Sequence, residues 1–310
     1  MVKQALKTAV AVAAGTLMLM GAAHAGTYAQ TKYPIVLAHG MAGFSSIAGI
    51  DYFYGVPQDL RSNGATVYST SVSAFNSAVL RGEQLLTQVE DISAISGAKK
   101  FNLVGHSQGN QSIRYVAAVR PDLVASVTSV GGVTFGSPVA DLIQGLSGLV
   151  GPTVSNLIAS VVNALGSVEA LLSGNSSLPQ DSLEGTLPSL TTSGAAAFNA
   201  AYPAGVPTTS CGQGAAVVNG IRYYSWSGTG QVYNVLDPAD YILKVTAAVL
   251  PEASDGLVGK CASHLGVVLR DNYPMNHLHE VNQLLGLVGL GADPVGLYRI
   301  QANRLKKLGL

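Results

Sequence analysis

The chain has 310 residues, and its 17 basic and 17 acidic side chains balance to a net charge of zero. Only 11% of the residues are charged and there is no basic block, so nothing in the sequence would attract nucleic acid or an anionic membrane surface electrostatically. The mean hydropathy of +0.33 comes partly from an apolar N-terminus, and the remainder favours an exposed or switchable apolar surface.

The first 25 residues have the pattern of a secretory signal peptide. Lys3 and Lys7 precede an apolar run over residues 9–20, and Ala23-His24-Ala25 provides a small-residue cleavage site. The run is short for a membrane span, which makes a permanent anchor the weaker interpretation. We therefore expect a protein secreted through the periplasm. Without the two lysines its mature chain has 15 basic and 17 acidic residues, a net charge of −2.

Residues 26–310 are expected to form a single domain, because no Pro/Ser linker, charge block or repeat divides them. Apolar segments indicate strands and amphipathic segments indicate helices, in alternation. Strands are expected at 33–39, 65–72, 101–104 and 124–130, and helices near 57–62, at 81–92 and after 109. This alternation predicts an α/β fold with a mostly parallel sheet that is covered by helices on both faces.

The segment Gly105-His106-Ser107-Gln108-Gly109 fits the pattern G-x-S-x-G. A short apolar strand comes before it and a helical pattern comes after it. A strand that turns abruptly into a helix holds the serine on a strained, exposed corner, where a Cβ on either flanking glycine would collide with the strand or the helix. Five-residue patterns also recur by chance, but here the expected context is present. We therefore interpret Ser107 as the nucleophile of a hydrolase.

A strand near the start of the mature chain ends in His39-Gly40, followed by Met41. In hydrolases with a serine elbow, the loop after such a strand supplies one N–H group to an oxyanion hole. Met41 would donate its backbone N–H here, and Gln108 would donate the other. Any strand-end turn could read His-Gly, but its occurrence together with the elbow favours the oxyanion interpretation.

The alternation of strands and helices stops after residue 130. Residues 140–173 are expected to be helical, and their apolar residues recur at helical spacing. A helix packed in the core would show the same stripe. Because this insertion directly follows the nucleophile segment, an amphipathic lid over the site, at about 140–190, is equally well supported. Residues 183–199 are polar and rich in glycine, so we expect them to be irregular or marginally helical.

The two cysteines, Cys211 and Cys261, both lie in the exported part of the chain. An even count and an oxidising compartment favour a disulfide over two buried thiols. Neither cysteine has the sequence context of a nucleophile.

A serine nucleophile requires a histidine base, and that base requires a carboxylate to hold its tautomer. The hydrolase order Ser…Asp…His leaves several candidates open: Asp237, Asp240, Asp255 and Asp271, then His264, His277 and His279. Asp255 lies at a turn, and His277 follows a loop and precedes a helix that is expected from about Glu280, which favours this pair modestly. His264 is close to Cys261, so we expect a structural role for it.

At these residues the chain resembles the secreted triacylglycerol lipases of the Pseudomonas/Burkholderia group, over essentially the whole mature chain. The segments that carry the resemblance are 31–40, 81–86, 113–123, 223–228, 255–259 and 275–278. It implies an α/β-hydrolase fold with a mobile lid. It also implies that Ser107, Asp255 and His277 form the triad, that Met41 and Gln108 form the oxyanion hole, and that Cys211 and Cys261 are joined.

The chain departs from this family at two places near the expected acyl-binding side. Asn110 stands where the family usually has a second glycine after the elbow, and Val133-Thr-Phe-Gly-Ser137 replaces a stretch with Pro-His and a basic residue. A preference for acyl chain length is therefore not carried over.

The resemblance also implies one structural calcium ion, held by two aspartate side chains and two backbone carbonyls. Asp237 matches the first aspartate, and Gln283 and Leu287 match the two carbonyl positions. His279 stands where the second aspartate would be, which removes a charge and an oxygen ligand that calcium prefers. Asp237 capping the turn before Pro238, with no calcium bound, is nearly as well supported.

These observations predict a secreted triacylglycerol lipase with a Ser-His-Asp mechanism and no organic cofactor. The alternative is a carboxylesterase for short-chain or polyester substrates without interfacial activation. The expected partners are a lipid substrate at an oil–water interface and, by the resemblance, a membrane-anchored foldase. A monomer is expected. A non-catalytic protein with the same fold is a remote alternative, because all three triad members are present.

Overall fold

The structure is a computed structural model, and it describes residues 26–47, 49–145, 183–209, 211–231 and 237–310. The expected signal peptide and most of the expected lid lie outside these residues. Within them, no helix has the length and apolar character needed to cross a membrane.

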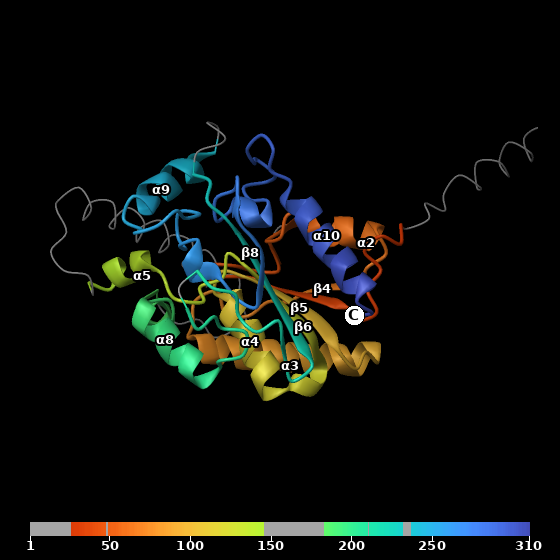
Figure 1. Cartoon of the computed structure of the whole chain (residues 1–310). Coiled ribbons are helices and arrows are strands. Elements are labelled where there is room, and N and C mark those ends of the chain that lie inside the picture. Colours follow the sequence, from red (N-terminus) through yellow and green to blue (C-terminus); the bar gives the residue numbers. More distant parts are fainter. Residues whose placement is uncertain (1–25, 48, 146–182, 210, 232–236) are drawn as a thin grey trace, which may run out of the picture.

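A seven-stranded, mostly parallel sheet forms the centre of the molecule (Figure 1), as the sequence predicts. Its order is β4 (Val67–Ser69), β1 (Ile35–Ala38), β5 (Phe101–His106), β6 (Val124–Val130) and β8 (Ile221–Gly228). Both β7 (Val217–Val218) and β9 (Val267–Tyr273) pair with β8, and β7 is the antiparallel one. A separate antiparallel pair joins β2 (Ser46–Ile47) to β3 (Ile50–Asp51).

Helices bury both faces of the sheet. Strand β1 is an example, because all four of its residues are apolar. Val36 and Ala38 pack toward α3 (Ala78–Ser96) and α4 (Gly109–Val119), whereas Ile35 and Leu37 pack toward α2 (Val56–Ser62) and α10 (Pro294–Lys307). Successive side chains of a strand point to opposite faces, so a strand covered on both sides is apolar throughout. Figure 1 shows α3 and α4 on one side of the sheet and α2 and α10 on the other.

The remaining helices are α5 (Pro138–Ile143), α7 (Leu183–Thr186), α8 (Thr192–Ala201) and α9 (Pro238–Ala247). The 3-10 turns are η1 (Pro121–Leu123), η2 (Leu187–Ser189), η3 (Cys261–Ser263) and η4 (His279–Val281). Figure 1 shows α5, α8 and α9 on the same side of the molecule. Part of α5 and η2 packs with Phe75, Val133 and Val258 in a separate apolar cluster.

Two local elements differ in regularity from the expectation. Residues 183–199 were expected to be irregular or marginally helical, and 192–201 form the regular helix α8, because Thr191 caps its first turn and a run of three alanines favours helix. The helix expected from Glu280 is only a single 3-10 turn, which ends at Asn282 with φ of 61°.

Cys211 and Cys261 form the expected disulfide, which closes a separation of 50 residues. It joins the loop before β7 to the 3-10 turn before β9. Among the described residues there is no free cysteine.

Candidate active site

Ser107 occupies the sharp turn between β5 and α4. Its φ of 55° lies in the left-handed region, which costs a non-glycine residue free energy unless the surroundings enforce it. The packing around the two flanking glycines holds Ser107 in this conformation. A Cβ on Gly105 would lie 2.4 Å from the Gly109 carbonyl oxygen, and a Cβ on Gly109 would lie 2.4 Å from the Ala38 carbonyl oxygen. The close approach of strand and helix therefore depends on both glycines. The resulting tight turn places Ser107 just beyond the end of strand β5.

His277 and Asp255 come together from two loops that follow β8 and β9. The His277 Nδ1 atom lies 2.8 Å from the Asp255 Oδ2 atom, and the His277 N–H donates to the Asp255 carbonyl at 2.9 Å. The other carboxylate oxygen accepts from the N–H groups of Leu257 and Val258 at 2.9 and 2.7 Å. Asp255 is fully buried, so these bonds hold its charge in place.

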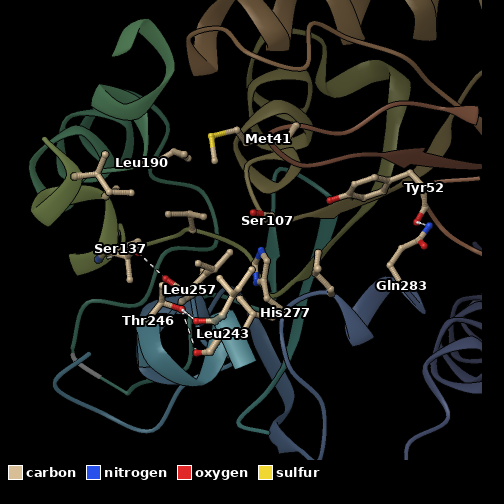
Figure 2. Close-up of a pocket in the computed structure, with 18 of the residues that line it drawn as sticks. Met41, Tyr52, Ser107, Ser137, Leu190, Leu243, Thr246, Leu257, His277 and Gln283 are labelled. Carbon is tan, nitrogen blue, oxygen red and sulfur yellow. Dashed lines mark hydrogen bonds between the residues drawn. The ribbon is translucent and has the colours of Figure 1, made fainter. Parts of the chain in front are cut away.

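The pair is arranged so that the second ring nitrogen of His277 is available for proton transfer. A carboxylate can only accept, which assigns the proton to Nδ1 and leaves Nε2 as the acceptor. His277 and Ser107 line the same cavity, and Figure 2 shows the His277 ring pointing toward Ser107. The structure thus brings together the three residues to which the resemblance gave the triad.

The other candidate acids and bases are engaged elsewhere. His264 Nε2 lies 3.0 Å from Asp271 Oδ2, and its Nδ1 lies 3.0 Å from the Gly212 carbonyl, next to the disulfide. His279 faces Asp237 and Asp240. These residues do not line the cavity that contains Ser107.

Two backbone N–H groups flank the serine. Within the described part of the chain, neither the Met41 N–H nor the Gln108 N–H donates a hydrogen bond. Their neighbours are fixed: the Ala42 N–H donates to the Ala74 carbonyl at 2.9 Å, and the Gln108 side chain donates to the Asn76 carbonyl at 3.0 Å. Both N–H groups are therefore free within the described residues, which the expected oxyanion hole requires.

Arg81 braces the loop that carries Met41. Its buried guanidinium donates to the carbonyls of His39 at 2.7 Å and Gly40 at 3.0 Å, and also to those of Ser73 and Ala74. Burial lowers the pKa of Arg81 to about 9. The sequence assigned this residue only to a helix, since its contacts depend on the packing of α3 against β1.

A buried polar chain connects the two loops of the site. Tyr52 Oη accepts from the Gly40 N–H at 3.3 Å and lies 2.8 Å from His106 Nδ1, while His106 Nε2 lies 3.0 Å from the His277 carbonyl. Burial, followed by the nearby His277, holds the pKa of His106 well below its usual value, so this imidazole is neutral. Sequence reasoning missed both residues: Tyr52 carries no motif, and His106 occupies a variable position of the elbow pattern.

Glu280 is a second buried carboxyl close to the pair of Asp255 and His277. Its Oε1 accepts from the Gly228 N–H at 2.6 Å, and its Oε2 lies 3.5 Å from His106 Nε2. Burial raises its pKa well above the usual value, and the charge of Asp255 adds to the rise.

The cavity above Ser107 and His277 measures about 620 Å³ and is lined almost entirely by apolar side chains. These include Met41, Val133, Leu187, Leu190, Leu243 and Leu257, several of which are drawn in Figure 2. The cavity is in the size range of small-molecule sites and suits a hydrocarbon chain next to the reacting groups.

A ring nitrogen lies among the side chains expected to bind calcium. Asp237 faces the ring of His279, whose Nε2 lies 3.4 Å from the Asp237 Oδ2 atom. Gln283 and Leu287 are expected to contribute only backbone carbonyls, and the Gln283 side chain donates to the carbonyls of Asp51 and Tyr52 at 2.7 and 3.1 Å. Because calcium prefers oxygen ligands, an imidazole in place of the second carboxylate does not suit this ion.

Comparison with known proteins places this architecture in a family. The family model for the alpha/beta hydrolase fold matches residues 33–281. Among solved structures, the mature form of a Bacillus licheniformis lipase superposes with a TM-score of 0.57 at 19% identity, covering 80% of this chain and 86% of the other. A metagenomic carboxyl esterase superposes with a TM-score of 0.58 at 18% identity, covering 90% of this chain and 77% of the other. At such identities these structures bear on the fold alone.

Three curated proteins are much more similar in sequence, and each is named triacylglycerol lipase. The protein of Vibrio cholerae is 55% identical over 285 residues, covering 91% of this chain and 90% of its own. The Pseudomonas fragi protein is 42% identical, and the match covers 91% of this chain and 98% of the relative. The Burkholderia plantarii protein is also 42% identical, and the match covers 92% of this chain and 89% of the relative. The chain therefore belongs to the α/β-hydrolase family and, within it, to the family of these bacterial triacylglycerol lipases.

Proposed function

We propose that this protein is a secreted triacylglycerol lipase that hydrolyses fatty-acid esters through an acyl-enzyme formed on Ser107. The observation that carries the proposal is the joint position of Ser107 and the hydrogen-bonded pair of His277 and Asp255 on the wall of one apolar cavity. The family membership supports the class of substrate, and the cavity supports an apolar acyl group.

In the first half of the reaction, His277 Nε2 takes the proton of the Ser107 hydroxyl as its oxygen attacks the ester carbonyl carbon. The C–O bond to the alcohol then breaks, and His277 returns the proton to the leaving alcohol. Asp255 keeps the imidazole in the required tautomer and stabilises its positive charge while it holds the proton.

In the second half, His277 takes a proton from water, the resulting hydroxide attacks the acyl carbon, and the fatty acid leaves as the proton returns to Ser107. In both halves the negative oxygen of the tetrahedral intermediate would accept hydrogen bonds from the N–H groups of Met41 and Gln108. Donors that are positioned before the reaction need no reorganisation, and a single such donor contributes on the order of 3 kcal/mol.

The site of action is proposed to be an oil–water interface outside the cell. The N-terminal 25 residues have a signal-peptide pattern, and the disulfide suits an oxidising compartment. By the family resemblance, a membrane-anchored foldase is the proposed partner before secretion. A calcium ion takes no part in the proposed reaction.

The substrate class is tested by rates on tributyrin below and above its solubility limit. A triacylglycerol lipase is expected to show a sharp increase once droplets form, and to hydrolyse emulsified long-chain triacylglycerol. A smooth saturation curve without such an increase, with activity only on dissolved short-chain esters, would favour the carboxylesterase instead.

A further inference from the structure

Three buried side chains gather beside the loop that carries His277. Asp237 directly precedes α9, Asp240 lies in its first turn, and His279 follows His277 by two residues; all three are fully buried. His279 Nε2 lies 3.4 Å from Asp237 Oδ2 and 3.3 Å from Asp240 Oδ1. The ligand atoms of all three lie within 4.8 Å of one another.

The ring of His279 is distinguished from the other buried histidines by its hydrogen bonding. Neither of its nitrogens has a hydrogen-bond partner within the described part of the chain. By contrast, His106 is bonded at both nitrogens, and so is His264. Leaving a fully buried polar group unsatisfied is costly, so a buried imidazole whose two nitrogens have no hydrogen-bond partner indicates a missing ligand.

The spacing of these atoms matches a small tetrahedral metal ion. Zinc binds histidine nitrogen at about 2.0–2.1 Å and carboxylate oxygen at about 2.0–2.2 Å, which places neighbouring ligand atoms of a tetrahedron about 3.3–3.5 Å apart. The two separations from His279 Nε2 are 3.4 and 3.3 Å.

The charge of the two carboxylates and the hydrogen bonds around them are consistent with a bound divalent cation. A divalent ion would balance the charge of two buried carboxylates. The Asn276 side chain orients the cluster, since its amide donates to Asp240 Oδ1 and its oxygen accepts from the His279 N–H at 2.8 Å. Contacts of this kind, which fix the ligands themselves, are typical of metal sites.

We propose that Asp237, Asp240 and His279 bind one zinc-class divalent cation, in place of the calcium ion that the family resemblance implies. Nitrogen from imidazole with few oxygens suits zinc and its neighbours, whereas calcium requires six to eight oxygen ligands. The ion would tie the start of α9 to the turn His279–Val281 and so brace the loop of His277. Its role is structural, and it takes no part in ester hydrolysis.

The test measures metal binding directly on the full mature protein. After treatment with a chelator, zinc chloride and calcium chloride are added separately in calorimetric titrations and in thermal unfolding. We expect one zinc ion per chain and a higher Tm with zinc, and no change with calcium. Cobalt(II) should bind at the same site and give the visible absorption of a tetrahedral nitrogen–oxygen complex.

Substitutions show whether the zinc ion binds at His279. Two different substitutions of this residue are used, so that the test still gives a result if one variant is unstable. His279→Ala should lose zinc binding, and His279→Asp should exchange the zinc response for a calcium response, because it adds a carboxylate. His264→Ala removes a comparably buried histidine that also faces an aspartate and should bind zinc as the wild type does. The proposal is overturned if the wild type binds no zinc, if only calcium raises its Tm, or if His279→Ala retains the zinc ion. None of these readouts depends on catalysis, so the outcome is independent of the proposed lipase activity.

Discussion

His106 Nε2 lies 3.0 Å from the backbone carbonyl oxygen of His277. A carbonyl can only accept, so His106 carries its proton on Nε2 and accepts at Nδ1 from the Tyr52 hydroxyl. The same hydroxyl accepts from the Gly40 N–H, one residue before Met41. One buried chain of hydrogen bonds therefore connects the loop of Met41, a proposed oxyanion donor, to the loop of the proposed base.

Tyr52→Phe should loosen both loops at once. The change removes the only hydroxyl between Gly40 and His106, leaving a buried donor and a buried acceptor without partners, at a cost of about 1–3 kcal/mol in stability. We expect kcat to fall by roughly tenfold while the enzyme stays folded. Tyr54→Phe, at a neighbouring, partly exposed tyrosine, is the matched control for ester hydrolysis and thermal unfolding. Equal kcat in both variants would remove Tyr52 from the positioning of the site.

Asp255→Asn should leave the fold in place and suppress hydrolysis. An amide can donate to His277 Nδ1 and so favour the tautomer that carries its proton on the wrong nitrogen. In a serine triad this change lowers kcat by about 10⁴-fold. Asp271→Asn, at the partner of His264, is the control and should retain activity on a p-nitrophenyl ester. If the two variants were equally active, Asp255 would not be the acid of the triad.

Acid should destabilise the protein partly through His39. Burial, together with the charge of Arg81, lowers the pKa of His39 from 6.5 to about 3. Between pH 6.5 and pH 3 the unfolded chain binds a proton at His39 that the folded chain does not bind. The contribution of His39 to the free energy of unfolding is therefore fully present above pH 6.5 and is lost as the pH falls toward 3. The contribution is on the order of a few kcal/mol. The Tm of His39→Asn should fall less steeply than that of the wild type from pH 7 to 4, and parallel curves would contradict the assignment.

Removing the disulfide should destabilise the fold without touching the reacting groups. Cys211 and Cys261 close a loop with a separation of 50 residues, for which the chain-entropy account gives about 4 kcal/mol. We expect the double variant Cys211→Ser, Cys261→Ser to unfold at clearly lower urea concentration, and its residual folded fraction to hydrolyse ester normally. Reducing agent should lower the midpoint of the wild type and leave that of the variant unchanged.

The sequence was most informative where local pattern and geometry coincide. The strand before Ser107, the glycines that flank it and the helix after it are adjacent in the chain, and so the elbow could be predicted from the residues. The alternation of strands and helices likewise predicted a sheet buried on both faces. The choice of Asp255 and His277 among four aspartates and three histidines needed the family resemblance, because spacing does not encode which loops meet.

Residues that act through packing could not be predicted in this way. Tyr52 and Arg81 reach the site only because the segment after β3 and helix α3 pack near the same end of the sheet. The helix at 192–201 was expected to be marginal at most, since its serine, threonine and glycine residues obscured a cap at Thr191. The expected lid at about 140–190 lies mostly outside the described residues and remains a prediction.

The central claim is that the Ser107 hydroxyl is the nucleophile activated by His277. An organophosphonate ester, followed by peptide mass spectrometry, tests it most directly by locating the covalent adduct while ester hydrolysis is recorded in parallel. The account predicts one adduct per chain on Ser107, complete loss of hydrolysis, no labelling of a folded Ser107→Ala variant, and much slower labelling of His277→Ala. An adduct on another residue, or ester turnover retained by Ser107→Ala, would contradict it.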